Sequence, residues 1–308
     1  MNDMNKIAVI GTVFMDIKGF SHNSYDPVGT NIGDIVFSFG GVGRNAAENL
    51  ANIGIPVSFL STVDVGSSGD EIISDLNAKG IDTHLILRTE NRGMGMWLAV
   101  LNSEGELCGS ISQQPDLTLL ENYIEEVIDD AVENCSAVVL EIDMSKAIAD
   151  RVFAAAEKFS KPVYAIVGNM SIINANKHML SKTACFICNN IEAGKLIDAD
   201  FTEVSVEMLK NEVINISDKL NISAMIITNG EHGAVYFDRN IGVSGHQPAI
   251  STNVVDTTGA GDAFFSGTVG ALTRGYTIGK ACEYGAILAS KVISSPLSSA
   301  QQCLDFFE

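Results

Sequence analysis

The sequence predicts an α/β fold, in which helices cover both faces of a mostly parallel sheet. Short apolar segments of strand length alternate with amphipathic segments of helix length along most of the 308 residues. The chain is 46% hydrophobic and 19% charged, so it can bury a large core. No fixed-period repeat and no low-complexity tract interrupts the alternation. These observations exclude a disordered, fibrous or solenoid protein.

The individual elements follow from hydrophobic periodicity and from the residues that flank each segment. Strands are predicted at 6–10, 57–62, 137–142, 162–167, 184–188 and 224–228. Helices are predicted between them at 44–53, 69–79, 117–133, 146–159 and 204–220. A last helix is predicted to begin in the sequence "GAGDAFF" and to end near Gly275.

Two segments depart from this alternation. Residues 13–39 and 85–112 are turn-rich and strand-like and contain no helical pattern. Both leave the same predicted sheet, so we expect them to meet as a small antiparallel flap that excludes water from a ligand beneath it. Two unrelated surface hairpins are the alternative.

Charge and cysteine content limit the class of protein. The chain has 19 basic and 38 acidic residues, a net charge of -19, and no basic cluster that would favour nucleic acid. Backbone amides can still hold a nucleotide locally. The pair Cys185 and Cys188 has a metal or redox spacing but lies in an apolar strand, so we expect two buried core cysteines. No signal-peptide core or membrane-spanning run is visible, and a reducing, cytoplasmic setting is expected.

The tetrapeptide Gly259-Ala260-Gly261-Asp262 begins an apolar helix. Free amides at a helix N-terminus bind anions, and the glycines allow unusual backbone conformations. Asp262 then fits a general base that accepts a hydroxyl proton. An ordinary aspartate N-cap is the alternative.

Three further motifs carry candidate ligand contacts. "GGVGRN", with Gly41 and Asn45, is a glycine-rich helix start that lacks both the G-x-G-x-x-G dinucleotide fingerprint and the Walker A lysine. "NNIE" and "TNGEHG" each follow a strand, at the sheet edge where α/β proteins bind ligands. Asn and Glu three residues apart could hold a hydrated Mg²⁺. Taken singly, each of these motifs also fits a helix cap or a turn.

Together these motifs resemble the ribokinase (PfkB) family of carbohydrate kinases over essentially the whole chain. "GGVGRNAAENLANIG" is similar to the amino-terminal signature of that family and "DTTGAGDAFFSG" to its carboxy-terminal one. The resemblance implies one ribokinase-like domain over residues 1–308, a three-layer α/β/α sandwich with a small β-sheet lid. It also implies a phosphotransferase that uses ATP and Mg²⁺, with K⁺ as a further cation in many members.

The resemblance assigns roles residue by residue. Asp262 is the implied catalytic base, and the implied anion hole consists of the amides of Gly259, Ala260 and Gly261. The substrate would contact Asp16, Gly40, Gly41, Asn45 and Glu141. The ATP site would include Asn189, Thr228, Gly230 and Gly233. Glu192 would organise Mg²⁺ through water, and a monovalent cation would lie at Asp256 and Thr258.

Within the family, "VIGTVFMDIKGFSH" and "GGVGRN" are most similar to the pseudouridine kinase branch, whose substrate is phosphorylated on the ribose 5′ hydroxyl. A ribokinase- or fructokinase-like sugar kinase is the alternative. Two positions depart from the family pattern: "AIVGN" replaces Asp-Pro after Tyr164, and Ile187-Cys188 replaces Lys-Pro before Asn189. These departures bear on the substrate more than on catalysis.

Two other classes of protein compete with a kinase. A sugar- or nucleotide-sensing module could use the same fold, but Asp262 is intact and no appended DNA-binding domain is visible. An oxidoreductase is disfavoured because the dinucleotide fingerprint is missing. Partners are therefore expected to be a small sugar or nucleoside, no nucleic acid and no membrane. A homodimer formed through the lid is also expected, because its strand edges can pair between subunits.

Overall fold

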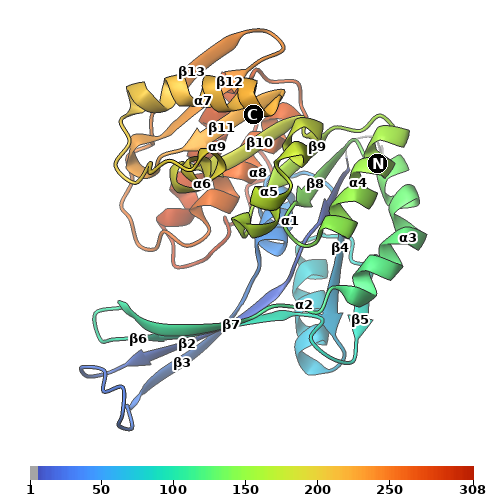
Figure 1. Ribbon diagram of the computed structural model, residues 1–308. Helices are drawn as coiled ribbons and strands as arrows, with labels where there is room; N and C mark the ends of the chain where they lie inside the picture. The colour runs from blue at the N-terminus through green and yellow to red at the C-terminus, as the bar shows by residue number, and fades with distance from the viewer. Residues whose placement is uncertain (1–5) are drawn as a thin grey trace.

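The computed structural model describes residues 6–308, and its centre is a nine-stranded sheet (Figure 1). All neighbouring strands are parallel except β12 and β13, which add an antiparallel edge. The predicted α/β fold is confirmed, and the six predicted strands are present to within two residues at each end. In spatial order the strands are β13 (Val243–Gln247), β12 (Ala234–Asp238), β11 (Ala224–Thr228), β10 (Cys185–Asn189), β9 (Val163–Ile166), β8 (Ala137–Glu141), β1 (Ile7–Ile10), β4 (Val57–Asp64) and β5 (Ile86–Thr89).

Helices cover both faces of this sheet and make it the middle of three layers (Figure 1). Alternate residues of β1 separate the two cores: Ala8 and Ile10 join one, Ile7 and Val9 the other. One core is closed by α3 (Thr118–Glu133), α4 (Lys146–Lys158), α5 (Met170–Ala175), α6 (Asn190–Ile197), α7 (Val206–Leu220) and the 3₁₀ segment η2 (Lys177–Lys182). The other is closed by α1 (Val42–Asn52), α2 (Ser67–Ala78), α8 (Ala260–Leu272) and α9 (Ile278–Ile293).

The two cysteines of "CFIC" lie in these cores as expected. Cys185 belongs to one core and Cys188 to the other, because β10 turns them to opposite faces of the sheet. Both thiols are free and buried. Their pKa values are raised by burial, so they are inert thiols and not a joint metal or redox site.

A second, four-stranded sheet projects from the body at the lower left of Figure 1. Its strand order is β3 (Gly33–Gly40), β2 (Phe14–Ser21), β6 (Gly95–Leu101) and β7 (Leu107–Gln113). The two predicted hairpins therefore do meet, so the alternative of unrelated surface hairpins is wrong.

Two details of the predicted flap need correction. The central pair, β2 with β6, is parallel and not antiparallel, because both strands run outward from the same edge of the large sheet. The predicted range 85–112 also includes β5, which pairs with β4 in the large sheet, so the second hairpin spans only residues 95–113.

None of the helices within residues 6–308 combines the length and the hydropathy that a membrane span requires.

Candidate active site

The carboxyl ends of the parallel strands bring the predicted motifs to one edge of the large sheet. Glu141 ends β8, Asn189 ends β10 and Thr228 ends β11. The chain after β1 and the start of α1 meet at the same edge, where the amide of Arg44 donates to the carbonyl of Thr12. This is the edge at which open α/β sheets bind their ligands.

The "GGVG" segment lets α1 begin directly against the end of β1. Gly41 is the N-cap of α1 with φ 102°, and a Cβ there would lie 2.5 Å from the carbonyl oxygen of Thr12. The carboxylate of Glu141 accepts hydrogen bonds from the amide and hydroxyl of Thr12 at 2.7 and 2.9 Å and from the amide of Gly43 at 3.1 Å. Glu141 thus fastens α1 to β1, while its predicted contact with a substrate stays a prediction.

Asn45 and Asp262, which are 217 residues apart, are joined by a hydrogen bond. Asn45 Nδ2 donates to Asp262 Oδ2 at 2.8 Å, so α1 and α8 meet at the predicted base. Burial raises the pKa of Asp262 to about 7, with a further contribution from the charge of Glu192, while the Asn45 bond and the charge of Arg44 act in the opposite direction. A carboxyl group with a pKa near 7 is suited to accept and release a proton at neutral pH.

The start of α8 supplies backbone amides beside Asp262. Gly259 is its N-cap in the left-handed region with φ 80°, and a Cβ at this position would lie 2.0 Å from the carbonyl oxygen of Ser298. The amides of Gly259 and Gly261 have no hydrogen-bond acceptor among residues 6–308, whereas the amide of Ala260 donates to the carbonyl of Thr257 at 3.2 Å. Two of the three predicted anion-hole amides are therefore free in this conformation.

A cavity of about 190 Å³ adjoins Asp262 and brings together some of the predicted phosphate and nucleotide residues. It is lined in part by Asn189, Glu192, Thr228, Gly261 and Asp262. Asn189 and Glu192 form a capping box: the Asn189 side chain accepts from the Glu192 amide, and Glu192 Oε2 accepts from the Asn189 amide. The N-x-x-E motif is thus a helix cap that also lines the cavity, so the two interpretations of it are compatible.

Glu192, the residue predicted to organise Mg²⁺, lines this cavity. Burial raises the pKa of its carboxyl group. The described residues contain no group of three or more His, Cys, Asp or Glu side chains that could enclose a metal ion. Mg²⁺ that binds with a nucleotide needs only one or two carboxylates, because phosphate oxygens and water complete its shell. The cavity is lined by two carboxylates, those of Glu192 and Asp262, a number that fits that requirement.

The T-x-G-x-x-G motif forms the turn between β11 and β12. Thr228 lines the cavity, whereas Gly230 begins the 3₁₀ segment η3 (Gly230–His232) and Gly233 follows it. The face of Gly230 is open, with no heavy atom within 4 Å of the Cβ position. Gly233 packs against β13, where a Cβ would lie 2.1 Å from the carbonyl oxygen of Gln247. A nucleotide contact along this turn stays a prediction.

A larger cavity of about 490 Å³ lies between the small sheet, α1 and the chain after α9. Asp16 of β2 lines it, and a Cβ on Gly40 would lie 2.5 Å from Asp16 Oδ2. Burial raises the pKa of Asp16, opposed by the charges of Lys18 and Arg44. The predicted cation residues Asp256 and Thr258 also line this cavity, with the Thr258 amide bonded to Asp256 Oδ1 at 2.8 Å. The cation itself stays a prediction.

Asp143 is a residue of this region that sequence reasoning missed. It lies two residues after Glu141, and burial together with the charge of Glu141 raises its pKa to about 7. Its carboxylate accepts hydrogen bonds from the amides of Gly168 and Asn169. These two residues belong to "AIVGN", the segment that departs from the family pattern, so this segment is bonded to a side chain that follows the neighbouring strand β8. Its position just after β8, at the carboxyl end of a parallel strand, is the feature of the sequence that could have identified it.

Comparisons with known proteins agree with this geometry. The family model described as pfkB family carbohydrate kinase matches residues 4–303. A guanosine-inosine kinase from Exiguobacterium acetylicum is 40% identical over 295 residues, covering 95% of each chain. A pseudouridine kinase from Escherichia coli K12 is 22% identical over 300 residues, covering 96% of this chain and 92% of that protein.

A solved structure shows the same fold. The ribokinase of Arabidopsis thaliana, complexed with ribose and ATP, superimposes with a TM-score of 0.82 at 21% identity, covering 97% of this chain and 96% of the other.

Proposed function

Because this chain belongs to the pfkB family of carbohydrate kinases, we propose that it transfers the γ-phosphate of ATP to the 5′ hydroxyl of guanosine or inosine. The chain is a phosphotransferase with an alcohol group as acceptor, a sugar or nucleoside kinase. The purine nucleoside is the finer proposal. The single observation that carries it is the 40% identity to a guanosine-inosine kinase over 95% of both chains.

The expected pseudouridine kinase branch is not confirmed. The curated pseudouridine kinase shares 22% identity with this chain, well below the 40% of the guanosine-inosine kinase. Two segments suggested that branch. Both contain residues that bond to Glu141, namely Thr12 and Gly43, and these bonds join the start of α1 to the end of β1. They carry no information about the nucleobase of a substrate. These motifs therefore predict the class of enzyme but not the acceptor substrate.

In the proposed mechanism, Asp262 accepts the proton of the attacking hydroxyl, and Asn45 holds the carboxylate in position. The free amides of Gly259 and Gly261 stabilise negative charge on the phosphoryl group during its transfer. Mg²⁺, when bound, neutralises charge on the phosphates of ATP. Glu192, across the smaller cavity, is the side chain proposed to orient it through water.

We also propose that the small sheet is a lid for the acceptor. Asp16, Lys18 and Ser38 line the larger cavity from the sheet, opposite Arg44 of α1. Closure of this sheet onto the body would exclude water from the reacting groups and suppress hydrolysis of ATP.

An acceptor panel tests the substrate proposal. We expect kcat/KM for guanosine and inosine to exceed that for pseudouridine by about 10-fold or more, because a base that leaves buried polar groups unpaired is strongly rejected. ADP formation would be measured with guanosine, inosine, adenosine, uridine, pseudouridine, ribose and fructose. A higher kcat/KM for pseudouridine or for a free sugar would contradict the purine assignment and leave the kinase class intact.

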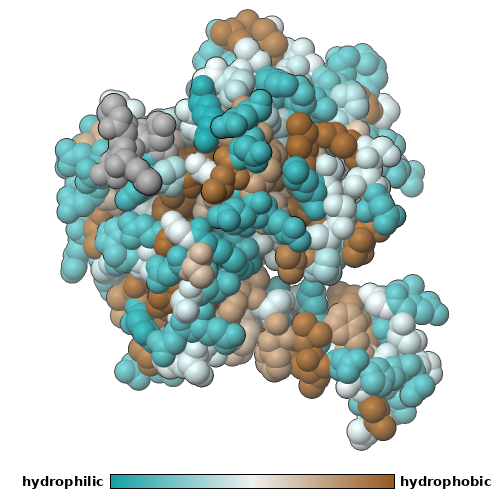
Figure 2. All heavy atoms as spheres, turned by 180° about the vertical axis from the view of Figure 1, so that it is seen from behind, coloured by the Kyte–Doolittle hydropathy of each residue, from teal (hydrophilic) through white to brown (hydrophobic). Residues whose placement is uncertain are grey.

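A homodimer formed through the lid remains a proposal, supported by an apolar row across the small sheet. Phe37, Ile17, Leu98 and Ile111 are neighbours on four successive strands. They lie on the face opposite Asp16, since adjacent residues of a strand point to opposite sides. Phe37 is 65% and Ile111 70% exposed, and Figure 2 shows apolar side chains on the projecting sheet. A second copy of this sheet would cover such a row.

Phe37→Asp should convert the proposed dimer to a monomer, because it would place two charges in an apolar interface. Light scattering would show the halved mass. Val28→Asp is the matched control, since Val28 is 95% exposed at the tip of the β2–β3 loop, outside the row. A wild-type chain of monomeric mass would contradict the proposal.

A further inference from the structure

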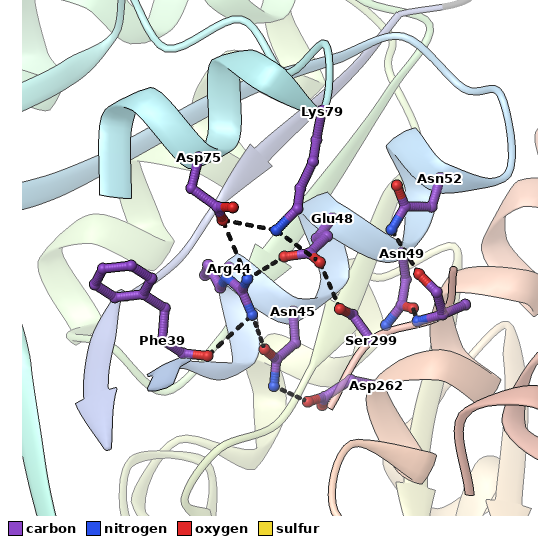
Figure 3. Close-up of polar contacts among 11 residues, drawn as sticks. Phe39, Arg44, Asn45, Glu48, Asn49, Asn52, Asp75, Lys79, Asp262 and Ser299 are labelled. Atoms are coloured by element: carbon purple, nitrogen blue, oxygen red, sulfur yellow. Dashed lines mark hydrogen bonds and ion pairs between the residues drawn. The ribbon is translucent and has the colours of Figure 1, made fainter. Parts of the chain in front are cut away.

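Arg44 is a buried cation directly beside the proposed base and its partner. The residue is 5% exposed and lies on the first turn of α1, next to Asn45. Its Nη1 atom donates to the carbonyl oxygen of Phe39 at 3.0 Å and to Asn45 Oδ1 at 3.1 Å (Figure 3). The guanidinium therefore contacts the side chain that contacts Asp262.

The other side of Arg44 is fixed by a cluster of charged and polar side chains from three parts of the chain (Figure 3). Its Nη2 atom pairs with Glu48 and lies 3.5 Å from Asp75 Oδ2. Lys79 Nζ joins the same two carboxylates, at 3.0 Å from Glu48 and 2.6 Å from Asp75. Ser299, beyond α9, donates to Glu48 Oε1 at 2.5 Å. Two cations and two anions balance, and they hold the guanidinium in one place.

This fixed guanidinium decides which way the Asn45 amide faces. A guanidinium can only donate hydrogen bonds, so the atom of Asn45 that faces Arg44 must be the oxygen. The NH₂ group of Asn45 must then face Asp262, and an NH₂ group can only donate. A donor stabilises the ionised carboxylate, which is the form that accepts a proton from the substrate.

We propose that Arg44 is a positioning residue for phosphoryl transfer, which acts through Asn45 to present a hydrogen-bond donor to the Asp262 carboxylate. The inference rests on the proposed role of Asp262 as the base. Arg44 lines the larger cavity and not the smaller cavity that adjoins Asp262. It would therefore act on Asp262 through the side chain of Asn45. Without Arg44 the amide could rotate and turn its oxygen toward the carboxylate.

Other charged groups also act on Asp262. Glu192 of α6 and Glu141 of β8 are anions whose charges interact unfavourably with the Asp262 carboxylate. Arg44 is the cation that opposes them. The proposed role therefore has two parts that one experiment must separate: the direct charge of Arg44, and the orientation of Asn45.

A double-mutant cycle separates these parts. Arg44→Met alone would leave Glu48 short of a partner in the buried cluster, so it is combined with Glu48→Gln to keep the charges balanced. Glu48→Gln alone is the matched control. We expect the pair to lower kcat about 10-fold relative to Glu48→Gln alone, as is typical when a group that orients a functional side chain is lost.

The same pair is then built on Asn45→Ala. If Arg44 acts through Asn45, the pair should cost less than about 2-fold in this background, because nothing remains to be oriented. The same 10-fold loss in both backgrounds would overturn the proposal, and so would a pair with the kcat of the control. Thermal unfolding checks that each variant is folded. If the pair does not fold, Arg44→Gln combined with Glu48→Gln replaces it in the same cycle, because a glutamine amide can present either a donor or an acceptor to Asn45 and so does not fix its orientation.

The acceptor in these assays is whichever compound the wild-type chain phosphorylates fastest. A wrong guanosine or inosine assignment would then appear in the acceptor panel alone and leave the cycle readable. An Asp262→Asn variant with normal turnover would instead refute the role of the base, independently of the cycle.

Discussion

Asp262→Asn should lower kcat by about 10²–10⁴-fold, the range that a positioned general base contributes. This corresponds to about 3–5 kcal/mol of transition-state stabilisation. The amide cannot accept the hydroxyl proton, while it keeps the size of the carboxylate and can still accept the Asn45 hydrogen bond through its oxygen. Single-turnover phosphorylation of the acceptor measures the loss.

Binding of ATP should change little in this variant, because the residues around the nucleotide are untouched. Calorimetric titration of the nucleotide tests this. Asp200→Asn is a matched control, since Asp200 is exposed and bonds only to neighbouring Thr202. Turnover of Asp262→Asn within a few-fold of the wild type would show that another group takes the proton.

The sequence predicted secondary structure best where a hydrophobic pattern extended over several helical turns. The five helices predicted with both bounds are present to within two residues at each end, because each contains several turns with one apolar stripe. The last predicted helix ends at Leu272, three residues before Gly275. The helices α5 and α6, with six and eight residues, are too short to show such a stripe. In α6 the N-x-x-E motif was also read as a ligand pair or a cap, and it is in fact a capping box that lines a cavity.

Two larger elements were missed for other reasons. The helix α9 was not predicted, and the segment "AVYFD" of β12 was not recognised as an antiparallel return after Thr228. A β-α-β rhythm leads one to expect another helix there. The turn at Gly230–His232 is too short for a crossover, so the chain can only reverse.

For the site, the sequence suggested candidate residues but not the contacts among them. Asp262 and Asn45 were each visible in a motif, but nothing local connects residues 217 positions apart. The hydrogen bonds of Glu141 with Thr12 and Gly43 were not visible in the sequence, and its contact with a substrate stays a prediction. Arg44 of "GGVGRN" was not predicted to have a function, because its proposed role depends on a cluster of side chains from α1, α2 and the chain beyond α9.

Activity should fall steeply on the acid side of neutrality. Burial raises the pKa of Asp262 to about 7, and a base works only when unprotonated. Below this pKa the ionised fraction falls 10-fold for each pH unit, so kcat/KM should rise with a slope of about one up to pH 7 and then level off. At pH 5 about 1% of the plateau should remain. Initial rates with both substrates far below saturation report on the free protein.

Asp143 is the group that could imitate this profile, because its pKa is also raised to about 7. Asp143→Asn separates the two carboxyl groups. If Asp262 is the titrating base, the acid limb should persist in this variant with at most a small displacement. The charge of Glu141 interacts with both Asp262 and Asp143, and it is unchanged in the Asp143→Asn variant. Loss of the acid limb in Asp143→Asn would transfer the titration to Asp143. An acid limb near pH 4 in the wild type would mean that Asp262 is ionised throughout, as an exposed aspartate would be.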